Sequence, residues 1–161
     1  MNFTIREMNN EDIKPIQAIA QKSWNATYEG IIPEEIQNNF LAMAYSDEMM
    51  QQRLKHSFMY VAEMESEIYG FANFTPVDEK GISELSAIYL DPDHQNKGMG
   101  TALLDKGIQN IEGLKEIRLE VEKENKIGMQ FYKAKSFKVV EEYDEDFDGH
   151  ILKTVIMKLE L

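Results

Sequence analysis

The sequence predicts an α+β domain with a mixed, mostly antiparallel twisted sheet of about seven strands flanked by helices. Three observations support this. The hydrophobic period changes from helical to alternating near residue 58, the strand-like runs in the middle are joined by short turns, and strand–helix–strand passages lie near both ends. Hairpins imply antiparallel pairing, whereas the passages through helices permit parallel neighbours. At 161 residues, the chain fits one domain spanning 1–161.

The first third of the chain predicts one strand followed by helices. Residues 3–8 alternate apolar and polar side chains, and a helix with Ile13, Ile16 and Ile19 at helical spacing then runs to about Thr27. Gly30 marks its end. Two shorter helices are expected, one beginning at 33–35, where a proline precedes two acids, and one over 47–55.

The remainder predicts six strands and two helices. Residues 58–64 and 68–74 form a hairpin, a third strand covers 82–90, and a helix spans about 98–112. A clean alternation over 115–121 predicts a strand, and Asn125 caps a helix that runs to about Ala134. The closing hairpin is expected from 137–142 and 151–159.

Charge and composition exclude several classes of partner. The net charge of −12 disfavours nucleic acid, because lysine and arginine form no basic patch. No apolar run approaches the roughly 20 residues of a membrane span, no secretory signal is visible, and the absence of cysteine is compatible with a cytoplasmic protein. The acidic run 141–148 is expected to be a solvated loop, or else a surface that attracts a cationic substrate.

The segment 95–101, Gln-Asn-Lys-Gly-Met-Gly-Thr, predicts an anion site between a strand and a helix. Unpaired main-chain N–H groups at a helix start face the positive end of its dipole, and two glycines leave room for a close approach. A Walker loop would need a lysine before Thr101, and a dinucleotide fingerprint would need glycine or alanine in place of Leu103. A helix start without a ligand also fits the segment.

Two segments together resemble the GNAT acetyltransferases. Residues 87–104, Ala-Ile-Tyr-Leu-Asp-Pro-Asp-His-Gln-Asn-Lys-Gly-Met-Gly-Thr-Ala-Leu-Leu, are similar to that family's Arg/Gln-x-x-Gly-x-Gly/Ala signature. Residues 125–133, Asn-Lys-Ile-Gly-Met-Gln-Phe-Tyr-Lys, resemble its Asn-x-x-Ala-x-x-Phe-Tyr block. The order of elements matches over the whole chain. Ser136 stands where the family usually has glycine, and Gly128 where it has alanine, so a positive φ at Ser136 would be costly.

The resemblance implies acetyl-coenzyme A as acetyl donor. The implied coenzyme-binding residues are Ile88, Tyr89, Leu90, Gln95, Asn96, Lys97, Gly98, Met99, Gly100, Thr101, Asn125 and Tyr132. In the family, main-chain groups corresponding to Ile88 and Leu90 pair with the pantetheine arm, and a bulge opens the slot. The apolar residues change from an odd position, Leu85, to even positions, Ile88 and Leu90, across Ser86-Ala87, as an inserted residue would cause.

The chemistry needs a proton donor for the thiolate and a route for the amine's proton. The resemblance implies that Tyr132 is the general acid, although a core aromatic is the alternative. Glu84 is the candidate base, directly or through water, and Glu120 and Glu122 could share that role. No metal site is predicted, because the three histidines lack ligand spacing.

Trp24 and Tyr28 are the candidate acceptor-binding residues. They share a helix face at i and i+4, and a similar stretch lines the acceptor pocket in many GNAT enzymes, although packing in the core is an equal alternative. Aromatic faces in an acidic surround suit an ammonium group, so a polyamine-like amine is expected first and a peptide amino terminus second. A non-catalytic acyl-coenzyme A sensor and a nucleotide-binding module remain alternative functions. A homodimer is a possible assembly.

Overall fold

The computed structural model describes residues 2–161, which form a seven-stranded sheet with five α-helices and two short 3₁₀ turns. The helical elements are η1 (Asn10–Asp12), α1 (Ile13–Tyr28), α2 (Glu34–Ala44), α3 (Asp47–His56), η2 (Pro92–His94), α4 (Met99–Asn110) and α5 (Lys126–Ala134). The strands are β1 (Thr4–Glu7), β2 (Phe58–Met64), β3 (Glu67–Phe74), β4 (Ile82–Leu90), β5 (Glu116–Glu122), β6 (Lys138–Phe147) and β7 (His150–Glu160).

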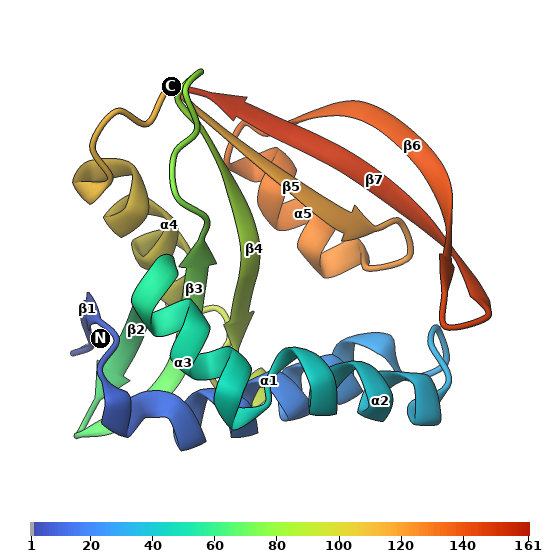
Figure 1. Cartoon of the computed structure of the whole chain (residues 1–161), viewed down its shortest axis with the longest axis horizontal. Coiled ribbons are helices and arrows are strands. Elements are labelled where there is room, and N and C mark those ends of the chain that lie inside the picture. Colours follow the sequence, from blue (N-terminus) through green and yellow to red (C-terminus); the bar gives the residue numbers. More distant parts are fainter. Residues whose placement is uncertain (1) are drawn as a thin grey trace.

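The strand order is β1-β2-β3-β4-β5-β7-β6, and only β4 and β5 run parallel. The prediction of a mixed, mostly antiparallel sheet is therefore confirmed. Figure 1 shows β4 and β5 starting side by side near the C-terminus and then diverging, with β4 running down towards α1 and β5 running to the right. This divergence, at the only parallel pair among residues 2–161, divides the sheet into two wings.

Two hydrophobic clusters cover the two faces of the sheet. One joins α1, α2 and α3 to the sheet and includes the buried side chains of Ile16, Met50 and Phe71. The other lies under α4 and α5 and includes Leu103 and Leu119. Burying these alternating side chains fixes which residues of each strand face which helices.

The helix ends follow the predicted signals. Asn125 accepts a hydrogen bond from the Gly128 N–H at 2.9 Å, which confirms it as the cap of α5. At the other end of this helix, Ser136 has φ +74°, so a non-glycine residue does hold the left-handed position. The N–H of Phe137 donates to the Tyr132 carbonyl at 3.0 Å and closes the turn.

The acidic segment 141–148 is not the expected loop, and that prediction was wrong. Its residues through Phe147 belong to β6, which pairs with β7 along its whole length. The acids stand mostly exposed on an edge strand, where charge discourages pairing with another chain. Asp148 and Gly149, with φ of 52° and 84°, make the hairpin turn. An Asp-Gly pair is a strong hairpin signal, and it could have extended both predicted strands.

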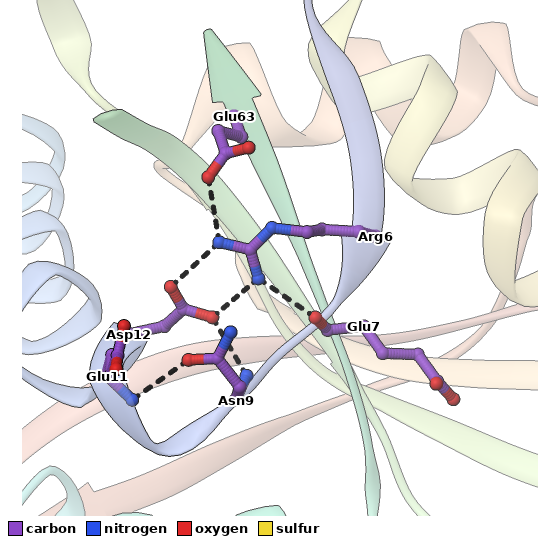
Figure 2. A network of polar contacts seen from close by, with 6 residues as sticks. All are labelled: Arg6, Glu7, Asn9, Glu11, Asp12 and Glu63. Carbon is purple, nitrogen blue, oxygen red and sulfur yellow. Dashed lines mark hydrogen bonds and ion pairs between the residues drawn. The ribbon is translucent and has the colours of Figure 1, made fainter. Parts of the chain in front are cut away.

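A polar network ties the N-terminal strand to the rest of the sheet (Figure 2). The Arg6 guanidinium donates to both carboxylate oxygens of Asp12, at 2.8 and 3.0 Å, and to Glu63 at 2.9 Å. Asp12 also accepts the Asn9 N–H at 2.8 Å and is almost completely buried.

Among residues 2–161, no helix is both long enough and apolar enough to cross a bilayer.

Candidate active site

A one-residue bulge in β4 opens the sheet. Asn73 on β3 pairs with Ala87 and Phe74 pairs with Leu85, so Ser86 is the extra residue. This confirms the insertion predicted from the change in apolar parity. β5 pairs with β4 only at Ile82–Glu84, before the bulge. Beyond that point the two strands part and leave a cleft between them.

The main chain of β4 beyond the bulge turns unused hydrogen-bonding groups towards the cleft. The Asp91 N–H donates to the Tyr69 carbonyl of β3 at 2.8 Å, so Asp91 and, by alternation, Tyr89 face β3. Ile88 and Leu90 must then direct their N–H and C=O groups to the opposite side, where β5 has moved away. An extended polar ligand could pair with β4 there like an additional strand.

The loop after β4 delivers a helix N-terminus to the same cleft. Asn96 and Gly98 both have left-handed backbones, with φ of 64° and 85°, and α4 begins at Met99. The Ala102 N–H donates to the Gly98 carbonyl at 3.0 Å. The N–H groups of the first turn before Ala102 are the ones that an α-helix leaves without internal partners, and they lie at the positive end of the dipole.

The two glycines of this loop serve different purposes. A Cβ on Gly98 would meet nothing within 4 Å, so glycine is needed there for its positive φ. A Cβ on Gly100 would lie 3.2 Å from the Phe131 ring, so glycine allows α4 and α5 to approach. The expectation that both glycines leave space for an anion therefore misses the packing role of Gly100.

The cleft has a volume of about 730 Å³ and brings together most of the predicted site residues. Those that line it are Trp24, Tyr28, Ile88, Tyr89, Leu90, Gln95, Asn96, Gly98, Gly100, Thr101, Asn125 and Tyr132. Lys97, Met99 and Glu84 are not among the lining residues. Met99 is completely buried and anchors the helix start in the core, whereas Glu84 lies on β4 before the bulge.

Several lining residues were not predicted as site residues. Ser86, Glu124 and Phe131 line the cleft, together with Glu120, which was predicted only as an alternative base. Phe131 adjoins Tyr132 in the predicted motif, but its contact with Gly100 depends on how two helices meet. Glu120 and Glu124 reach the cleft because β5 ends beside it, which follows from strand order rather than from a local motif.

Tyr132 of α5 and Tyr28 of α1 both line the cleft. Burial raises the pKa of Tyr132 well above its usual value, with a further contribution from Tyr89. Burial likewise raises the pKa of Tyr28. Both phenols therefore keep their protons at neutral pH, so they can donate a proton or a hydrogen bond.

Trp24 belongs both to the core and to the cleft wall. Its ring centroid lies 4.6 Å from that of Tyr28 and 4.4 Å from that of Phe40, and the side chain is buried. The predicted shared face of Trp24 and Tyr28 is confirmed. An aromatic wall of this kind favours the organic part of an acceptor and, at a ring face, a cation.

Acidic side chains lie along β5, on one side of the cleft. Because Leu119 and Val121 face α4, Glu120 and Glu122 face the side of α1. The Glu122 carboxylate accepts the Glu124 N–H at 2.5 Å. Partial burial and the nearby charge of Glu120 raise the pKa of Glu84 above its usual value. The site therefore combines protonated phenols with carboxylates.

A mixed sheet opened by a strand bulge, with a helix N-terminus at the opening, is the arrangement that the resemblance to the acetyltransferases led us to expect. The model of the acetyltransferase (GNAT) family matches residues 17–137. The match covers more than half of the chain, and the chain belongs to this acetyltransferase family.

Individual relatives extend the match to nearly the whole chain. A spermidine N(1)-acetyltransferase of Thermoplasma acidophilum is 31% identical and covers 92% of this chain and 93% of its own. An uncharacterized N-acetyltransferase of Bacillus subtilis, YuaI, is 35% identical over 94% of this chain and 90% of its own. The crystal structure of a PaiA N-acetyltransferase from T. acidophilum, in complex with coenzyme A, superposes with a TM-score of 0.86 at 28% identity, covering 100% of both chains.

Proposed function

We propose that residues 1–161 form a single N-acetyltransferase domain that transfers an acetyl group from acetyl-coenzyme A to a primary amine of a small cationic acceptor. A polyamine is the first candidate and a peptide amino terminus the second. The observation that carries the proposal is the cleft itself, in which the free strand edge of Ile88 and Leu90 leads to the N-terminus of α4.

The residues present suit the donor. An amide-containing pantetheine arm is an extended polar chain that can pair with the main chain of Ile88 and Leu90. A diphosphate is the anion that the first turn of α4 would bind, with Gly98 shaping the loop and Asn96 beside it. The donor supplies a thioester carbonyl as electrophile and a thiolate as leaving group.

The chain's own side chains account for the proton movements. Tyr132 is proposed to protonate the departing sulfur as the C–S bond breaks and the C–N bond forms, since its phenol stays protonated in the cleft. An acceptor ammonium gives up two protons in forming a neutral amide. We propose that one leaves through water and Glu84, and that the other restores the Tyr132 phenol.

A polyamine is preferred because one relative, at 31% identity, is a spermidine acetyltransferase and because the β5 wall is acidic. A ribosomal-protein-S18-alanine N-acetyltransferase of Escherichia coli also superposes, with a TM-score of 0.74. Its identity of 22% supports a shared fold only. The two acceptor classes differ in charge, because a polyamine carries several ammonium groups.

The proposal is tested by incubating the purified chain with acetyl-coenzyme A and a panel containing spermidine, a simple monoamine and a peptide with a free amino terminus. Release of free thiol and mass spectrometry of the acceptor report transfer. We expect acetylated spermidine at the highest kcat/KM. Coenzyme A binding without transfer to any acceptor would indicate the acyl-coenzyme A sensor instead. No binding of coenzyme A, measured by calorimetry, would refute the proposal.

A further inference from the structure

Glu120 is a cleft carboxylate held in place by a tyrosine from a distant strand. It lines the cleft from β5, and the Tyr143 hydroxyl of β6 donates to its Oε1 at 2.9 Å. β7 lies between the two strands, so the tyrosine reaches across a neighbouring strand. Nothing in the proposed proton transfer uses this pair.

A second layer of hydrogen bonds fixes the tyrosine. The Thr154 hydroxyl of β7, which is almost completely buried, donates to Glu145 Oε1 at 3.1 Å. The Tyr143 hydroxyl lies 3.4 Å from the same oxygen. The hydrogen bond with Glu120 is the main reason that the pKa of Tyr143 rises to about 12, so the phenol keeps its proton and is the donor.

Glu120 forms no ion pair with the part of the chain that the structure describes. Among residues 2–161, no lysine or arginine nitrogen lies within 4.0 Å of its carboxylate. The nearest cation on its own strand, Arg118, pairs with Glu116 instead. A second carboxylate, Glu84, lies close by, and partial burial together with the charge of Glu120 raises the pKa of Glu84. An oriented, unpaired carboxylate in a cleft is suited to a cation from outside.

We propose that Glu120 binds an ammonium group of the acceptor, and that Tyr143 is the positioning residue that holds the Glu120 carboxylate towards the cleft. This inference rests on the proposed function. The ammonium at Glu120 is the one that does not react, because an adjacent carboxylate stabilises the protonated amine and the attacking nitrogen must be neutral. Glu120 would thereby select linear amines that carry more than one positive charge.

The substitution Glu120→Gln keeps the size of the side chain and removes its charge. We expect the KM for spermidine to rise about 10- to 100-fold, as for the loss of a charge-assisted contact, while kcat stays within about twofold. A monoamine has no second ammonium, so its KM should change much less. A merely structural role would move both acceptors alike.

Tyr143→Phe tests the positioning role. We expect a rise of about 3- to 10-fold in the KM for spermidine, and little further loss when it is combined with Glu120→Gln, because both changes remove the same interaction. Tyr69→Phe is the matched control. The Tyr69 hydroxyl donates to Glu67 at the same distance of 2.9 Å, but neither residue lines the cleft, so its kinetics should match wild type.

Calorimetry of spermidine with the coenzyme A-saturated protein separates this inference from the proposed function. If wild type binds spermidine without acetylating it and Glu120→Gln weakens that binding, the proposed function fails and the inference stands. Equal affinities in wild type and Glu120→Gln, or no binding by wild type, would overturn the inference. Thermal unfolding checks each variant, and if Glu120→Gln does not fold, Tyr143→Phe decides the matter by the same comparison.

Discussion

Replacing Gly98 with alanine should strain the loop before α4, which is the proposed diphosphate site. Gly98 has φ +85°, and a Cβ there would meet nothing within 4 Å. The change is therefore almost purely conformational, without a steric clash. A left-handed backbone costs an alanine about 1–2 kcal/mol, and restriction of the unfolded chain returns about 0.4–1 kcal/mol.

The cost can appear in either of two measurements. If the loop keeps its shape in the free protein, Gly98→Ala lowers the free energy of unfolding and leaves coenzyme A affinity intact. If the loop relaxes, stability is spared and binding must restore the strained shape, which weakens the affinity by roughly 5- to 30-fold for 1–2 kcal/mol. In both cases the difference between these two contributions lowers the stability of the coenzyme A-bound protein by up to about 1.6 kcal/mol.

Denaturant unfolding with and without saturating coenzyme A, together with calorimetry, gives both quantities. Gly113→Ala is the control, since this glycine follows α4 at its other end with φ +77° and equally open space. It should lose similar stability with no change in coenzyme A affinity. Unchanged stability and affinity in Gly98→Ala would refute the argument that the loop needs its left-handed backbone.

Three further predictions test the proposed general acid, the core and the N-terminal network. Tyr132→Phe should lower kcat roughly 10²- to 10⁴-fold, with melting temperature and coenzyme A affinity unchanged; normal turnover in steady-state assays would remove Tyr132 as the acid. Gly107→Ala should lower the free energy of unfolding in denaturant by about 2 kcal/mol, because its Cβ would overlap the fully buried ring of Phe74 and overpacking of about 3 kcal/mol outweighs a helix-propensity gain of about 1 kcal/mol. Asp12→Asn should lower the free energy of unfolding by roughly 2–4 kcal/mol near pH 7. Burial alone would raise the pKa of Asp12, but the Arg6 contact lowers it, so this stabilisation is lost as the pH falls below the ordinary carboxyl pKa and through the lowered one. A difference between wild type and variant that persists in acid unfolding curves would contradict the ion pair.

Local patterns were sufficient for most of the fold. The bulge at Ser86 was predicted because an inserted residue moves every following side chain to the other face, which the apolar pattern records directly. The cap at Asn125 was predicted for an equally local reason. The failure at 141–148 came from treating charge as a sign of a loop, although an edge strand can carry acids on its exposed positions and the Asp148-Gly149 turn marked the hairpin.

The candidate site likewise has a part that local sequence predicts and a part that depends on contacts between distant elements. Its α4 side is continuous in sequence, so the residues that shape the loop around Gly98 could be predicted from their spacing. The face on which Glu120 lies could also be predicted, from the alternation along β5. Its contact with Tyr143 could not be, because the two residues meet across β7 and the contact depends on the register of three strands. Likewise, the close approach of Gly100 to Phe131 depends on the packing of two helices.

The bulge explains why the cleft has two chemically different sides. Before it, Leu85 faces the cluster under α4, and after it Ala87 faces the cluster under α1. The single extra residue therefore exchanges the two faces of the strand beyond it, so the main-chain groups of Ile88 and Leu90 face the gap that the parting strands create. β5 has no such insertion, and its uninterrupted alternation turns Glu120 to the side of α1. One strand thus contributes main-chain groups suited to the donor and the other a carboxylate suited to a cationic acceptor, and the two substrates would meet where these strands part.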